Sequence, residues 1–139
     1  MKSWLRTSVI KAIVFDKDGT LLDFEATWNE AVGAAFDQIS DAYARETSAD
    51  MFGYDLASRT VLPHSPFVSE SNDVVMGLVN DLIDVETFER TINQVSRLNV
   101  VPSREATATL KTLVANGVKL AIATNDSEAV ARHHVNALG

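Results

Sequence analysis

Residues 12–21 read Ala12-Ile13-Val14-Phe15-Asp16-Lys17-Asp18-Gly19-Thr20-Leu21, an apolar run that ends in two carboxylates and a glycine. The run predicts a buried parallel strand, and such strands place ligands at their carboxyl ends. The alternation of side chains along a strand would put Asp16 and Asp18 on the same side, and the glycine lets the chain turn there. Two carboxylates this close together indicate metal binding or acid and nucleophile chemistry.

Other uses of an Asp-x-Asp-Gly string fit the neighbouring residues less well. A calcium loop of the EF-hand kind needs a third acidic or amide ligand before its glycine, and Gly19 comes too early for that. A plain surface turn stays open as an alternative, because Asp and Gly are common turn residues. The side chain of Lys17, between the two carboxylates, is predicted to point away from both.

The segment Phe15–Leu21 resembles the first motif of the haloacid dehalogenase-like (HAD) hydrolase superfamily. The resemblance implies that Asp16 is the nucleophile and that Asp18 is the general acid/base. Dehalogenases of this superfamily lack the second Asp and P-type ATPases have Thr in its place, so Asp18 points to the phosphatases and phosphomutases. The resemblance also implies Mg2+ as the cofactor, bound by the side chain of Asp16 and the backbone carbonyl of Asp18.

A second apolar run, Val118–Asn125, ends in a hydroxyl and an amide. It resembles the second motif of the same superfamily, a strand that ends in Thr or Ser and binds the phosphoryl group. Taken alone, the run would be an ordinary strand end capped by polar residues. Together with the first motif, the resemblance implies that Gly19, Thr20, Thr124 and Asn125 bind the phosphate of the substrate.

Composition narrows the class of protein. The sequence has 139 residues, an ordinary apolar content and no cysteine, so it offers neither a disulfide framework nor a thiol nucleophile. Its formal net charge of -7 argues against a nucleic-acid surface. No apolar run is long enough to span a membrane, and Lys11 breaks the stretch that a signal peptide would need. We therefore expect a cytoplasmic protein that binds neither nucleic acid nor membrane, and the resemblance implies a small phosphorylated metabolite as its substrate.

Residues 24–100, between the two motifs, are predicted to be mostly helical. Apolar residues at helical spacing predict one helix that runs from Trp28 to Tyr43, a shorter one over 51–58 and another over 74–82. Asp84 is predicted to cap a fourth helix. The HAD superfamily has a helical cap domain at this place in the chain, and caps close over the site and choose the substrate. The alternative is that these helices simply flank the sheet.

The second motif has a helix on either side. Ser103 is predicted to cap the preceding helix, Asn116-Gly117 to end it, and Asp126 or Ser127 to begin a last helix that runs to Leu138. The expected fold is therefore α/β, a partial Rossmann-like HAD core of parallel strands flanked by helices with an inserted all-helical cap domain. In this division residues 1–23 and 101–139 form the core, and residues 24–100 form the cap.

The chain departs from the superfamily pattern after its second motif. HAD enzymes carry a third-motif Lys and a fourth-motif acidic cluster there, but no Lys follows Lys119, and Asp126 and Glu128 do not match the acidic motif. We therefore expect a truncated chain, holding two of the parallel strands of the core, that is weakly active or inactive by itself. The exposed sheet edge of the strand that ends at Thr124 is expected to promote self-association.

The leading hypothesis is a Mg2+-dependent phosphatase of small phosphorylated metabolites, of the phosphoglycolate phosphatase-like type, that acts through an aspartyl-phosphate. A phosphomutase of the same superfamily and a non-catalytic domain that binds a ligand or partner stay as alternatives. Other residues have simpler interpretations: Trp28 packs in the interior, His64 lies in a loop, Asp23 caps a helix, and His133 and His134 lie on a solvated helix face.

Overall fold

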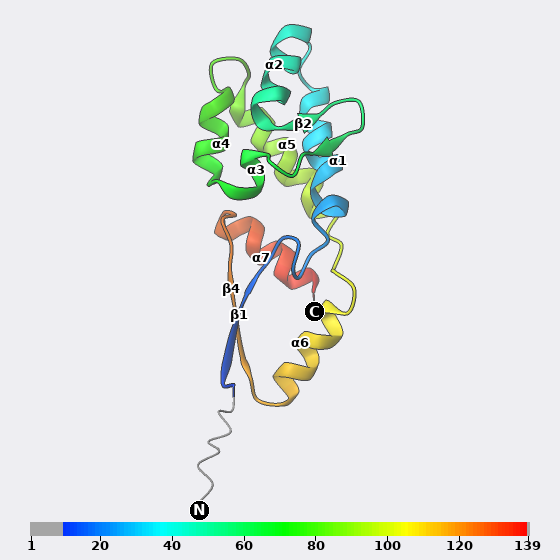
Figure 1. The fold of residues 1–139 in the computed structure, drawn as a ribbon, viewed down its shortest axis with the longest axis vertical. Helices are drawn as coiled ribbons and strands as arrows, with labels where there is room; N and C mark the ends of the chain where they lie inside the picture. The colour runs from blue at the N-terminus through cyan, green and yellow to red at the C-terminus, as the bar shows by residue number, and fades with distance from the viewer. Residues whose placement is uncertain (1–9, 139) are drawn as a thin grey trace, which may run out of the picture.

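The structure, a computed structural model, describes residues 10–138 and has an elongated α/β shape (Figure 1). Its elements in chain order are β1 (Ala12–Asp16), α1 (Phe24–Asp37), α2 (Ala42–Phe52), β2 (Tyr54–Asp55), β3 (Thr60–Val61), α3 (Pro66–Ser69), α4 (Asn72–Val79), α5 (Val85–Leu98), α6 (Ala106–Ala115), β4 (Lys119–Ala123) and α7 (Glu128–Ala137). Strands β1 and β4 form a parallel sheet, and β2 and β3 form a small antiparallel hairpin. A parallel sheet flanked by helices is the α/β class that the sequence predicts, as part of a Rossmann-like core.

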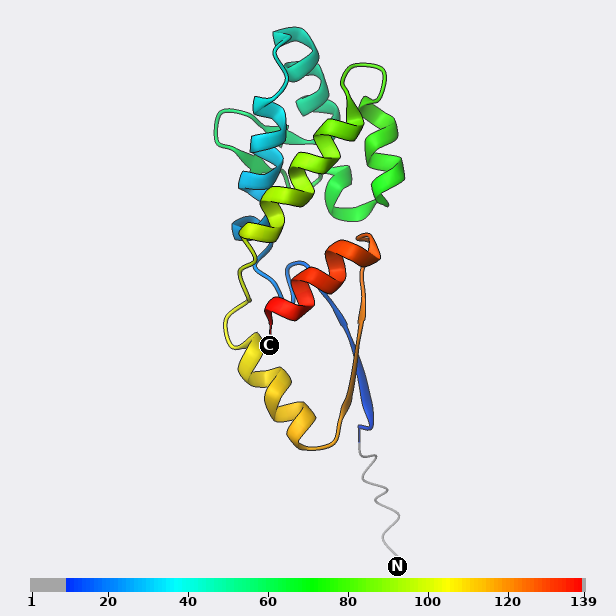
Figure 2. The same ribbon diagram turned by 180° about the vertical axis from the view of Figure 1, so that it is seen from behind.

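The parallel sheet is covered on one face. Helices α6 and α7 lie on the same side of it in both ribbon views (Figures 1 and 2). Phe15 and Ile122 face these helices across an apolar groove of about 420 Å³, to which Leu110 of α6 also contributes. Side chains alternate along a strand, so Val14 points to the other face, where it is 65% exposed.

Residues 24–100, called the helical segment below, pack around aromatic side chains. Phe52, Tyr54 and Phe88 surround Phe36, with ring centroids 4.8 to 5.7 Å from its ring. All four rings are buried, and buried aromatic side chains contribute much of the apolar area that stabilises a core. The segment lies beyond the carboxyl ends of β1 and β4, and on the covered side of the sheet α7 lies between the segment and α6 (Figures 1 and 2).

Two helix predictions in this segment are wrong. Helix α1 ends at Asp37 and does not continue to Tyr43, whose side chain is exposed on α2. The helix predicted over 51–58 does not form, because Gly53 adopts a left-handed φ of 74° and ends α2 there. The chain continues into the β2–β3 hairpin, so the segment is not entirely helical; strands of two residues are too short to show an alternating pattern.

Several helix ends lie where the sequence predicts them. The carboxylates of Asp23 and Asp84 each accept a hydrogen bond from the amide three residues later, and Ser127 caps α7 in the same way. Helix α6 is the exception, because its N-cap is Glu105, with a positive φ of 65°, and not Ser103. Among residues 10–138, no helix combines the length and the apolar character that crossing a membrane requires.

Candidate active site

The candidate site lies where the two parallel strands end. Asp16 is the last residue of β1 and pairs with Ala123, the last residue of β4. The loop that follows β4 places Asn125 and Asp126 beside Asp16, around one pocket. Open α/β sheets bind their ligands at this edge. The fold therefore brings together polar groups from opposite ends of the sequence.

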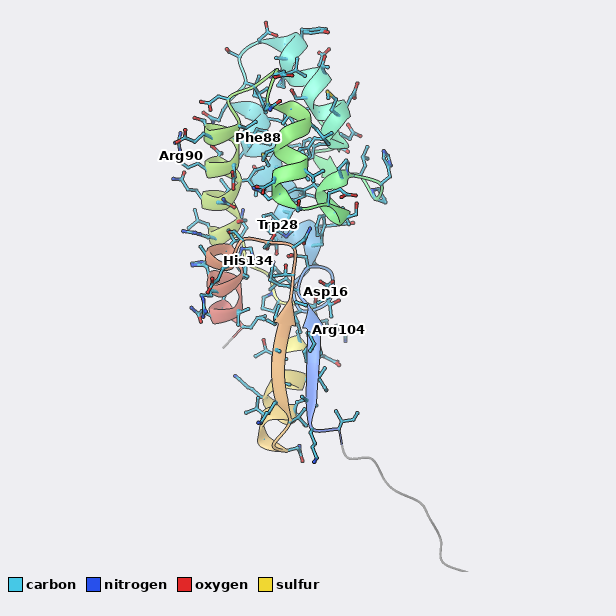
Figure 3. All side chains as sticks on the ribbon, turned by 90° about the vertical axis from the view of Figure 1, so that its left-hand side faces the viewer. Asp16, Trp28, Phe88, Arg90, Arg104 and His134 are labelled. Atoms are coloured by element: carbon cyan, nitrogen blue, oxygen red, sulfur yellow. The ribbon has the colours of Figure 1, made fainter. Side chains whose placement is uncertain are left out.

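A pocket of about 60 Å³ lies against this edge. Its lining consists of Asp16, Asp18, Asn125 and Asp126 from the sheet side, and Phe24, Trp28, Phe67 and Val68 from the helical segment. Figure 3 shows Asp16, Trp28 and His134 at the junction between the sheet and the helical segment. This volume holds a few water molecules, so the helical segment stands close over Asp16.

Both carboxylate oxygens of Asp18 accept hydrogen bonds. Trp28 on α1 donates its indole N–H to Oδ1 at 2.7 Å. Lys17 donates to Oδ2 at 2.5 Å. An aspartate held in this way can act as a base or as a fixed negative charge. For Asp18 to give a proton to a substrate, one of these oxygens must first be released from its donor.

The side chain of Lys17 is fully buried and donates to Asp18, so the prediction that it points away from both Asp16 and Asp18 is wrong for Asp18. Strand β1 ends at Asp16, and the amides of Leu21 and Leu22 donate to the carbonyl of Lys17 in a tight turn. The period of two that holds along a strand therefore no longer applies at this residue. The Lys17 ammonium also lies 2.7 Å from Asp126 Oδ2.

His134 completes the surroundings of this ammonium. Its Nδ1 lies 3.1 Å from Lys17 Nζ, and its ring meets the Trp28 ring edge-on with centroids 5.4 Å apart. The side chain is fully buried, so the prediction of a solvated face is wrong for His134, although His133 is exposed. Burial first, and then the nearby Lys17 charge, lower the pKa of His134 to about 4, so the ring is neutral at pH 7.

The remaining carboxylate of this cluster is Asp126. Burial raises the pKa of its carboxyl above the ordinary value, and its hydrogen bond and charge interaction with Lys17 oppose that rise. Ligand atoms of Asp18, Asp126 and His134 lie within 4.8 Å of one another, a spacing that a metal ion could bridge. Lys17 contacts all three groups, however, so this cluster is suited to a buried ammonium and not to a divalent ion.

The pocket itself presents a different set of donors. Three carboxylates and the Asn125 amide line it, and oxygen ligands of this kind are those that Mg2+ prefers. Asp16 is the exposed carboxylate of the set and has no place in the Lys17 cluster. The residues present therefore fit a hard divalent cation bound on the Asp16 side of the pocket.

The four residues predicted to bind phosphate lie in two places. Gly19 and Thr20 lie in the turn after β1, and Thr124 and Asn125 lie in the loop after β4. The amides of Gly19 and Thr20 donate within the turn, to Leu22 O at 2.9 Å and Lys17 O at 3.4 Å. Thr124 Oγ1 accepts a hydrogen bond from the amide of Asp126 at 3.2 Å. Asn125 lines the pocket and donates from its side chain to the carbonyl of Glu70, in the helical segment, at 2.8 Å.

The sequence was compared with known proteins. It matches the family described as "Hydrolase: haloacid dehalogenase-like hydrolase" over residues 10–139. A search of curated proteins found no match. The family match covers both strands, the residues at their carboxyl ends and the whole helical segment. The chain therefore belongs to the haloacid dehalogenase-like hydrolase family.

Proposed function

We propose that this hydrolase is a Mg2+-dependent phosphatase of small phosphate monoesters, with Asp16 as its nucleophile. The observation that carries the proposal is the pocket in which Asp16, Asp18 and Asn125 meet at the carboxyl ends of β1 and β4. Asp16 is exposed there, whereas Asp18 is held by donors on both oxygens. Two carboxylates in such different surroundings suit different roles in one reaction.

The reaction has two steps. A carboxylate oxygen of Asp16 attacks phosphorus, the ester P–O bond breaks, and Asp18 gives a proton to the leaving oxygen. Water then attacks the phosphorus of the aspartyl-phosphate while Asp18 takes its proton, and the bond between phosphorus and the Asp16 oxygen breaks. Inorganic phosphate leaves, Asp16 is a carboxylate again, and Asp18 again carries a proton.

Charge repulsion sets the main requirement of the first step. Two unit charges about 4 Å apart interact by roughly 4 kcal/mol at an effective dielectric constant near 20, and a phosphate dianion doubles this. Since each ~1.4 kcal/mol is tenfold in rate, the repulsion must be offset. Mg2+ would be held by the side chain of Asp16 and the backbone of Asp18, and when bound it neutralises the phosphoryl oxygens. Asn125 and Thr124 would orient the phosphoryl group.

The helical segment acts as the cap of this site in the proposal. Phe24, Trp28 and Phe67 cover the pocket that contains Asp16, and the Trp28 indole reaches across to Asp18. A cover of this kind excludes water from the reacting phosphorus and must move for substrate to enter. The position of the segment and its helical content are also the basis of the resemblance to the phosphoglycolate phosphatase-like branch.

The proposal is tested by phosphate release from a generic aryl phosphate with Mg2+ and with EDTA. Because no Lys follows Lys119 in the 139 residues, that chain is assayed and, where the coding sequence continues past Gly139, the extended chain is assayed beside it. We expect Mg2+-dependent release in at least one of them, lost in Asp16→Asn and kept in Asp81→Asn, a matched change at an exposed turn residue. Release that persists in a folded Asp16→Asn protein would refute the assignment. In a parallel assay with a sugar phosphate as substrate, an isomerised sugar phosphate in place of free phosphate would identify a mutase.

A further inference from the structure

The side chains that the helical segment turns toward the pocket carry no charge. They are Phe24, Trp28, Phe67 and Val68. The only polar atom among these four side chains is the indole nitrogen of Trp28, and its hydrogen is donated to Asp18. These four residues, the roof of the pocket below, can therefore contact a substrate through apolar and aromatic surface and offer it no cation.

The rest of the helical segment does not supply a cation to the roof either. Residues 24–100 contain thirteen Asp and Glu residues against four Arg and no Lys. The guanidinium of Arg59 is held by Glu30 and Asp37, both at 3.0 Å, on the outer side of α1. Among the described residues, none of the four arginines lines the pocket. The segment therefore carries a large excess of negative charge, which contributes a negative potential at the site.

The sheet side of the pocket is negative as well. Asp16, Asp18 and Asp126 line it, and the nearby Lys17 ammonium is buried and already paired with Asp18 and Asp126. A divalent cation that fits this site would be shared with the phosphoryl group. A second anionic group on the substrate, such as a carboxylate, would lose its water at the roof and gain no partner there.

We propose that the cap selects phosphate monoesters whose leaving group carries no negative charge, either a small alkyl group or one that bears an amine. The inference rests on the proposed phosphatase function and narrows its substrate class. The proposal predicts that this protein disfavours phosphoglycolate, the substrate after which the branch that its cap resembles is named, because phosphoglycolate carries a carboxylate on its leaving group. A protonated amine, in contrast, is favoured by the acidic surroundings of the pocket.

The test compares three substrates of similar size: ethyl phosphate, 2-aminoethyl phosphate and phosphoglycolate. We expect kcat/KM for the first two to exceed that for phosphoglycolate by at least about tenfold, the effect of one unfavourable charge interaction. Val68→Arg adds a cation to the roof at a side chain that is 45% exposed and so tolerates the change. It should shift the ratio about tenfold toward phosphoglycolate, whereas Val74→Arg, at a 49% exposed position on α4 outside the pocket, should leave the ratio unchanged.

Equal or better turnover of phosphoglycolate by the wild-type protein would overturn the inference, as would a folded Val68→Arg protein with an unchanged ratio. If none of the three compounds releases phosphate, the aryl phosphate assay alone decides on the proposed function, and the selectivity is read from binding. Calorimetric titration of the same compounds into the wild-type protein, which does not consume them in that case, then decides on the selectivity. Weaker binding of phosphoglycolate than of ethyl phosphate supports the inference, and equal binding, stronger binding or no binding of any compound overturns it.

Discussion

Replacement of Lys17 by Met removes the ammonium at the centre of the site and keeps a side chain of similar length. In the wild-type protein this ammonium is fully buried between Asp18 and Asp126, whose side chains are 16% and 18% exposed. His134 and the Trp28 ring, whose centroid lies 5.3 Å from Nζ, enclose it further. In Lys17→Met these two carboxylates keep their burial and lose their shared cation.

The size of the effect follows from these burials. Removing one partner of a buried ion pair typically costs about 3–5 kcal/mol, because a buried charge is left without compensation. Asp18 retains its hydrogen bond from Trp28, whereas Asp126 loses its ion-pair partner. Both carboxylates also keep partial access to water. We therefore expect Lys17→Met to lower the free energy of unfolding by about 3 kcal/mol, a large part of the stability of a small domain.

The assay is urea unfolding followed by far-UV circular dichroism, in which the midpoint and slope give the free energy of unfolding. The double variant Lys17→Met/Asp126→Asn should recover about 1–2 kcal/mol, since the stranded charge is removed with its partner. A loss below about 1 kcal/mol in Lys17→Met, or no recovery in the double variant, would show that the ammonium does not hold the cluster together.

Three further changes test separate parts of the account. Trp28→Phe removes the donor to Asp18 and keeps the aromatic packing, so kcat/KM for phosphate release should fall about tenfold with the fold intact; equal activity would show that the contact does not position Asp18. Folded His134 stays neutral down to a pKa of about 4, whereas the unfolded chain takes up that proton near pH 6.5, so the free energy of unfolding should fall as the pH drops through this range; His134→Gln should flatten the profile, and an unchanged slope contradicts the burial argument. Asp84→Ala removes the cap of α5 and should cost about 1 kcal/mol in urea unfolding, against little change for Asp81→Ala.

Strands β1 and β4 and several helix ends could be predicted because their signals are local. The apolar runs that end at Asp16 and Thr124 place β1 and β4, and the caps at Asp84 and Ser127 begin α5 and α7. The wrong helix predictions near Tyr43 and over 51–58 relied on the same kind of local signal. The helical spacing of apolar residues continues through both segments, although turns reverse the chain within them.

The buried cluster at the site could not be predicted in this way. Lysine is almost never buried without a partner, and the partners of Lys17 include Asp126 and His134, which are distant in the sequence. A signal for His134 was nevertheless present. Val130, His134 and Leu138 are four residues apart and share the buried face of α7, so a histidine in that series belongs to the interior.

The most direct test of the central claim is to trap the covalent intermediate on Asp16. Protein that releases phosphate is mixed with a radiolabelled aryl phosphate, quenched in acid during turnover, reduced with borohydride and digested for mass spectrometry. We expect label in the acid-quenched wild-type protein and conversion of Asp16 to homoserine after reduction, with neither in Asp16→Asn. Label retained in Asp16→Asn, or homoserine at another carboxylate such as Asp18 or Asp126, would contradict the account.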